Sequence, residues 1–128
     1  MDESRDIRDL ERERWGSQIC EAGMISIPAL LLDYMAQGRR LTDKDQKIIL
    51  RVLRHWDLEQ ERWPTVSIQV LSDELHISTS AIHKSIRRLV QRGLVGRAGK
   101  PGRIRCWDLS GLLSHAMQHH LKRQQSRA

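Results

Sequence analysis

The sequence predicts a single, mostly α-helical domain with a small β-hairpin. Its 128 residues suit one domain with a modest core. Apolar residues recur at helical spacing over most of the chain, and a segment rich in glycine and cations near residue 100 separates two short strand-like runs. The chain has four Trp, one Tyr and no Phe, so tryptophan must supply most of the aromatic volume of any core.

The best-defined helix is predicted between Ser78 and Gly93. Ser78 is a good N-cap, and Gly93 can end the helix in a left-handed conformation. The predicted apolar stripe consists of Ile82, Ile86, Leu89 and Val90. The opposite side is predicted to carry Ser80, Lys84, Arg87 and Gln91, with His83 and Arg88 on its flanks. Because this helix has no carboxylate, its polar face suits a polyanion, although a merely solvated face is the alternative for the helix taken alone.

The distribution of charge strengthens that interpretation. The net charge is +6, from 22 basic and 16 acidic side chains. Residues 76–105 contain eight basic residues and no acidic ones, so the rest of the chain carries 14 basic and 16 acidic residues. Clustering of the whole excess in one block is typical of a nucleic-acid site.

The first half of the chain predicts an arm followed by helices. Residues 2–14 alternate acids and bases, and Ile7 and Leu10 are the only large apolar residues before Trp15. This pattern indicates that residues 1–23 form a mobile arm or a short helix that orders against a partner subunit. A helix over residues 29–37 is expected to follow Pro28. Thr42 is expected to cap the next helix, whose core face is marked by Ile49, Val52, Leu53 and Trp56.

The second half predicts two helices joined by a tight turn and followed by a hairpin. Residues 63–66 are expected to form an edge strand, and Ser67 to cap a helix of about eight residues. The turn contains His76, for which we expect a positive φ. In the hairpin, Ile104 and Cys106 are expected to face the core, and Trp107 falls on the side of the arginines.

A last helix is predicted from about residue 109 to 124, capped by Asp108 or Ser110. Its expected apolar side consists of Leu112, Leu113, Ala116, Met117 and Leu121. This helix is expected either to pack back on the first helices or to pair with a symmetry mate.

Several functional classes are disfavoured by what the sequence contains. Cys20 and Cys106 form no closely spaced pair, no apolar run approaches the length of a membrane span, and the N-terminus is polar, so we expect a cytoplasmic protein with reduced thiols. No nucleophile motif, phosphate-binding glycine loop or metal signature is present, and we expect neither catalytic residues nor a cofactor. The histidines of the last helix are interpreted as solvated rather than as metal ligands.

The order of these elements resembles the winged helix-turn-helix domains of bacterial transcription regulators, and more closely those of plasmid and phage replication or control proteins. The resemblance covers roughly residues 24–108. Its matching pieces are Ile27-Pro28, Leu41-Thr42, Trp63-Pro64-Thr65, Leu71 to Ser78, Ile82, Leu89 and Arg92 to Val95. It departs at His76, where a glycine is often found, and in the helical segments added at both ends, residues 1–23 and 109–128. The resemblance implies binding to double-stranded DNA, with the second helix of the motif in the major groove and the wing against backbone or minor groove.

On this hypothesis, the candidate DNA-binding residues fall into two groups. The first half of the recognition helix offers base or groove contacts, from Ser78, Thr79, Ser80, His83, Lys84 and Arg87. The other group is better placed for phosphates, and it consists of Arg88, Arg97, Lys100, Arg103 and Arg105. We expect a homodimer on a two-fold site that regulates transcription of a plasmid, phage or bacterial operon. A replication-initiation or partition component that binds repeated sites is the first alternative, and a protein-interaction module is the second.

Overall fold

The computed structural model describes residues 6–37, 41–56, 63–98 and 106–126. The elements within these ranges are α1 (Ile7–Trp15), α2 (Ser17–Glu21), α3 (Ala29–Gln37), α4 (Asp43–Arg54), α5 (Ile68–Leu75), α6 (Thr79–Gln91), β1 (Gly96–Ala98), β2 (Cys106–Asp108) and α7 (Ser110–Ser126). Residues 57–62 and the tip of the predicted hairpin lie outside the described residues. The tip contains three candidate site residues and one expected core residue, which are Lys100, Arg103, Arg105 and Ile104.

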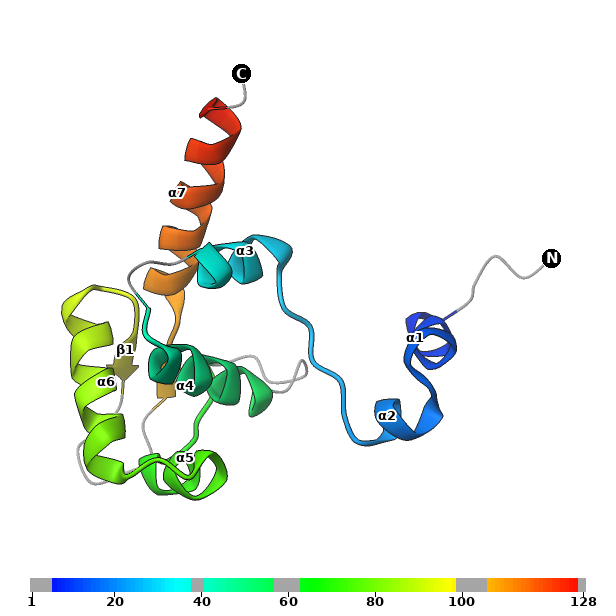
Figure 1. Cartoon of the computed structure of the whole chain (residues 1–128), viewed down its shortest axis with the longest axis horizontal. Coiled ribbons are helices and arrows are strands. Elements are labelled where there is room, and N and C mark those ends of the chain that lie inside the picture. Colours follow the sequence, from blue (N-terminus) through cyan, green and yellow to red (C-terminus); the bar gives the residue numbers. More distant parts are fainter. Residues whose placement is uncertain (1–5, 38–40, 57–62, 99–105, 127–128) are drawn as a thin grey trace.

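Helix α4 is the centre of the domain and packs against both α5 and α6 (Figure 1). Thr42 and Asp45 form a capping box at its start, in which the Asp45 N–H donates to Thr42 Oγ1 and the Thr42 N–H donates to Asp45 Oδ2, both at 3.1 Å. The predicted core positions Ile49, Val52 and Leu53 are buried, which confirms the apolar face of this helix.

The hairpin pairs β1 with β2 in antiparallel register, with Arg97 opposite Trp107. Trp107 is fully buried, and its Nε1–H donates to the Val66 carbonyl at 2.9 Å. Cys106 is only half-buried and forms an isolated bridge with Thr65. The expected inward position of Cys106 and outward position of Trp107 were therefore wrong. The largest apolar side chain of the strand takes the inward position because it buries the most surface and its indole N–H finds an acceptor there.

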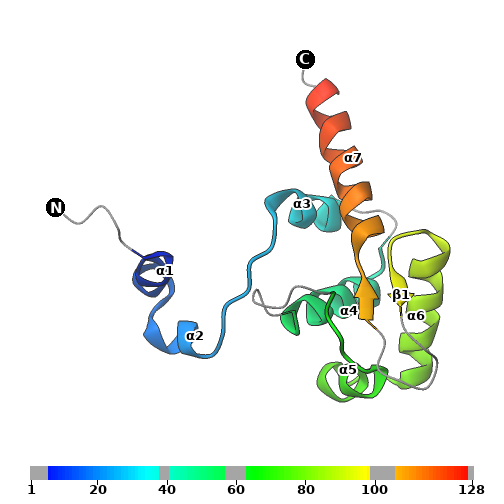
Figure 2. The same ribbon diagram turned by 180° about the vertical axis from the view of Figure 1, so that it is seen from behind.

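Helix α7 packs back on α3, which is one of the two arrangements expected for it (Figure 1 and Figure 2). Asp108 Oδ1 accepts the Ser110 N–H at its start, at 2.9 Å. His119 contacts α3, with its ring edge-on to Tyr34 at 5.7 Å between centroids. Leu112 and Ala116 are buried, but Met117 and Leu121 are about half exposed. The predicted apolar side was wrong at these two residues because the buried Ala116 and the contact of His119 define the side of α7 that faces α3, and at about 100° per residue Met117 and Leu121 lie on the far side.

Helices α1 and α2 stand apart from the rest of the domain (Figure 1 and Figure 2). Neither helix contains a buried residue. An extended segment, residues 22–28, joins them to α3. A short helix in this region agrees with one of the two expectations for residues 1–23. None of the helices in the described ranges is long and apolar enough to span a bilayer.

The left-handed residue of the turn gives a first testable prediction. His76 has φ 55° and ψ 41°, as expected from the sequence, and this conformation costs a non-glycine residue about 1 kcal/mol. We expect His76→Gly to raise the free energy of unfolding in urea by about 0.5–1 kcal/mol. His83→Gly, in the middle of α6, is the matched control and is expected to lower it by about 1 kcal/mol. A loss of stability in His76→Gly would show that the imidazole itself holds the turn.

Candidate nucleic-acid interface

Helix α6 has one face in the core and one face in solvent. Ser78 Oγ caps the helix by accepting the Ala81 N–H at 3.2 Å. Four positions fix the inner face, and they are the buried Ile82, Ser85, Ile86 and Leu89. Val90 was predicted in the apolar stripe but is exposed, because the buried face runs through Ser85 and is therefore centred away from Val90. The opposite face is therefore held outward by packing rather than by its own polarity.

The turn between α5 and α6 is fixed by local hydrogen bonds. The Ser72 hydroxyl donates to the Ile77 carbonyl at 2.6 Å, and the left-handed His76 directs the chain into the Ser78 cap. Helix α5 is also tied to the end of α4, where the His55 ring lies 2.5 Å from Glu74 Oε1. The hydrogen bond from His55 lowers the pKa of Glu74. Two short helices held at a tight turn form a helix-turn-helix motif.

The exposed face of α6 carries most of the predicted groove-contacting residues. Ser80, His83, Lys84 and Arg87 are all exposed and lie on the same side of the helix, together with Gln91. Ser78 is exposed at the cap, whereas Thr79 is half-buried. No Asp or Glu occurs on α6, so nothing on the helix itself neutralises its cations. We call these four residues, Ser80, His83, Lys84 and Arg87, the α6 face.

The hairpin lies beside α6 and presents one described arginine. The Arg97 guanidinium stacks over the Trp107 ring, with 4.2 Å between the guanidinium carbon and the ring centroid. Stacking on a buried aromatic ring holds the guanidinium close to the sheet. Arg97 was predicted to contact phosphate, and this packing gives its charge a fixed position at the base of the hairpin.

Residues 64–95, which span α5, the turn and α6, match a protein family described as winged helix-turn-helix DNA-binding. The chain contains a winged helix-turn-helix domain. In a domain of this kind, α6 is the second helix of the helix-turn-helix motif, and β1 and β2 are the base of the wing. A search of curated proteins found no significant match.

Arg88 differs from the cations of the α6 face because its guanidinium is hydrogen-bonded within the domain. The Arg88 Nη2 atom donates to Asp45 Oδ1 at 2.6 Å and to Thr42 Oγ1 and Ser85 Oγ at 3.3 Å. Asp45 is 0% exposed. Burial opposes ionisation of Asp45, but hydrogen bonds from Arg88 and the Thr42 backbone outweigh it and lower the pKa of the carboxyl. Arg88 was predicted to contact phosphate, yet its hydrogen bonds to Asp45 and Thr42 bind α6 to the start of α4.

This ion pair was not predicted from the sequence. Asp45 lies in the first turn of α4, where any carboxylate favours the helix dipole whether or not it has a partner. The Thr42-x-x-Asp45 spacing of a capping box was a usable signal, because it predicts that the carboxylate turns back toward the cap. The partner of that carboxylate, 43 residues later in the chain, had no sequence signal.

The described residues contain no group of three or more His, Cys, Asp or Glu side chains arranged to hold a metal ion. Of the histidines on α7, His119 lies 3.2 Å from Gln37 Oε1, a contact that helps to hold α7 on α3.

Proposed function

We propose that the protein binds double-stranded DNA sequence-specifically and regulates transcription of a plasmid, phage or bacterial operon. The observation that carries this proposal is the carboxylate-free α6 face, held outward by a fully packed inner face. On this proposal, α6 enters the major groove, where Lys84 and Arg87 can donate to guanine O6 and N7. The protein then works in the cytoplasm, where its DNA lies.

The two ends of the recognition helix favour different contacts. Ser78 and Ser80 lie at its N-terminus, where hydroxyls and backbone N–H groups suit a phosphate. His83, Lys84 and Arg87 follow over the next two turns and reach deeper along the groove. Backbone contacts set the register of the helix, and base contacts select the sequence.

We also propose that the protein acts as a homodimer on a two-fold site. Dimers of helix-turn-helix proteins read half-sites about one helical turn apart, so that the symmetry of the site mirrors that of the protein. A replication or partition component would instead bind several direct repeats. The arrangement of half-sites in the bound DNA therefore separates the two roles.

The test is selection of bound sequences from a random duplex pool with the full chain, followed by titration of the selected site across a salt series. We expect an inverted repeat to be enriched. If about four to six phosphates are neutralised per subunit, the log–log dependence of affinity on salt should have a slope of roughly −4 to −5 per subunit.

Two outcomes would contradict the proposal. A pool with no enriched sequence would remove sequence-specific binding. An affinity for DNA that does not change between about 50 and 200 mM salt would remove phosphate contacts. Either result would favour docking of the cationic face on an acidic protein.

A further inference from the structure

The N-terminal arm, residues 6–21, has an apolar surface that none of the described residues of its own chain buries. Its large apolar residues are each about half exposed or more, and they are Ile7, Leu10, Trp15 and Ile19. Isolated helices as short as α1 and α2 are unstable in water, and most helix stability comes from packing of an apolar face. The arm therefore needs a surface to pack against.

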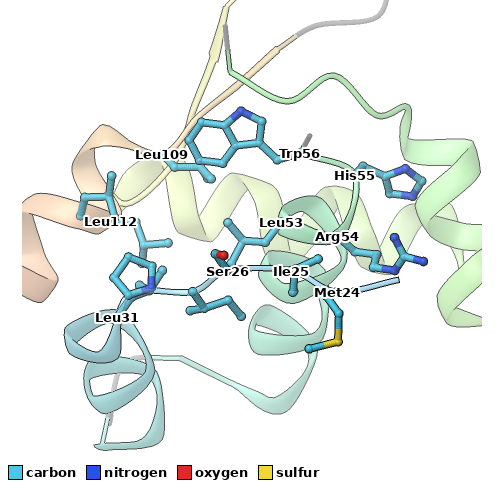
Figure 3. Close-up of a pocket in the computed structure, with 13 residues that line it drawn as sticks. Met24, Ile25, Ser26, Leu31, Leu53, Arg54, His55, Trp56, Leu109 and Leu112 are labelled. Atoms are coloured by element: carbon cyan, nitrogen blue, oxygen red, sulfur yellow. The ribbon is translucent and has the colours of Figure 1, made fainter. Parts of the chain in front are cut away.

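The domain offers a matching apolar pocket at the base of this arm. The pocket has a volume of about 950 Å³ and lies between residues 24–28, the end of α4 and the start of α7 (Figure 3). Its apolar wall includes Ile25, Leu31, Leu53, Trp56, Leu109 and Leu112. Pockets for drug-sized ligands have volumes of about 300–1,000 Å³, so this one has room for several side chains.

The charges at the two surfaces are also complementary. Residues 6–21 contain five acidic and three basic side chains. The polar side of the pocket is formed by Arg54 and His55, which lie together at one end of it (Figure 3). A slightly acidic apolar arm suits an apolar pocket that has the cation of Arg54 at its edge.

The path of the chain favours exchange between two copies. Residues 24–28 line the pocket themselves, but the arm then leads away from it, so that α1 and α2 lie clear of the domain (Figure 1). Reciprocal insertion of identical segments closes a two-fold dimer and leaves no apolar arm uncovered. No residue of α5 or α6 lines the pocket, so the α6 face stays free for DNA.

We propose that the arm of one copy packs into the pocket of a second copy, and the reverse, to form an arm-exchanged homodimer. This inference deepens the dimer of the proposed function and rests on it.

The test measures mass in solution by sedimentation equilibrium of the full chain, without DNA. Leu10→Asp disables the arm, and Ile25→Asp disables the pocket. Both side chains are exposed in the single chain, so neither change should unfold it. We expect the native chain to have twice its 14.9 kDa mass, and each variant to raise the dimer dissociation constant at least about 100-fold, because each change acts twice in a symmetric dimer.

Mixing the two variants gives the decisive measurement. A Leu10→Asp chain keeps its pocket and an Ile25→Asp chain keeps its arm, so an equimolar mixture can form one of the two exchanged contacts. We expect the mixture to associate at concentrations where each variant alone is monomeric. Val70→Asp is the control and should leave the mass unchanged. Val70 lies on α5, and its side chain is 39% exposed, the same fraction as that of Ile25.

Each contrary outcome identifies a different arrangement. A native chain that stays at 14.9 kDa near 100 μM means that no exchange occurs. A dimer that survives both Ile25→Asp and Ser26→Trp, which fills the pocket by size, means that the arms pair with each other or that α7 forms the interface. A mixture that does not associate also overturns the exchange. Because no DNA is present, these outcomes leave the DNA-binding proposal standing or failing on its own test.

Discussion

Replacing both Lys84 and Arg87 with alanine is expected to weaken binding of the selected DNA site about 100-fold, because each cation contributes about 1–3 kcal/mol when it contacts a base edge. Both side chains are exposed on the α6 face and project away from the residues that pack the helix into the core. Their removal should therefore leave the free energy of unfolding within about 0.5 kcal/mol of the native value. The measurement is the dissociation constant of the full chain at fixed salt.

The single variants separate a base contact from a phosphate contact. Loss of a base contact relaxes the preference at one position of the site, so the native and altered sequences bind the variant equally well. Loss of a phosphate contact weakens binding to all sequences alike and reduces the salt slope by about 1. We expect Arg87→Ala to relax a guanine preference, since a guanidinium is the group best suited to bidentate contact with guanine.

Lys122→Ala is the control for these variants. It removes one exposed cation from the far part of α7, away from α6 (Figure 1), and so changes the net charge as much as each single variant does. We expect its effect on affinity to be less than twofold. If the double variant binds DNA as tightly as Lys122→Ala, then α6 is not the recognition helix.

Much of this fold was accessible from sequence because local signals and periodicity agreed. Ser67 and Ser78 cap α5 and α6 as predicted, and His76 has the expected positive φ. In each case the signal and the structure concern neighbouring residues, so no tertiary information was needed. The family match over residues 64–95 agrees with the predicted helix-turn-helix.

The errors arose where a distant neighbour decides burial. Trp107 turns inward because the Val66 carbonyl accepts its indole N–H, a contact across 41 residues. Met117 is exposed because α3 lies against the side of α7 that carries His119, and the apolar spacing of α7 does not show which side that is. In the sequence, Arg88 looks like the cations next to it. Its contact with the buried Asp45 of α4 depends on how α4 packs on α6, and the sequence does not show that packing.

That acid makes Arg88 the cation of α6 with the largest expected effect on stability. We expect Arg88→Met to lower the free energy of unfolding in urea by about 3 kcal/mol at pH 7, because it strands the buried Asp45 carboxylate without its cation. Arg87→Met, the next residue on the exposed side of the helix, is the matched control and should change it by less than about 0.5 kcal/mol. In an Asp45→Asn background, where no buried charge remains, Arg88→Met is expected to cost less than in the native chain.

The pH dependence separates this ion pair from a simple loss of packing. Burial acts to raise the pKa of Asp45, but the bonds from Arg88 and Thr42 lower it below the ordinary value for aspartate. A carboxyl with a lowered pKa in the folded chain stabilises it above the unfolded pKa, and that contribution is lost as the pH falls through the folded value. Without Arg88, burial is less opposed and the pKa of Asp45 should rise. As the pH falls, Asp45 should therefore be protonated in the variant at a higher pH than in the native chain, and protonation removes the unpaired buried charge that destabilises the variant. The stability difference between native and Arg88→Met chains should then be largest near neutral pH and shrink below about pH 4. A difference that stays constant over this range would mean that the methionine disturbs packing and that the Asp45–Arg88 pair contributes no net stability.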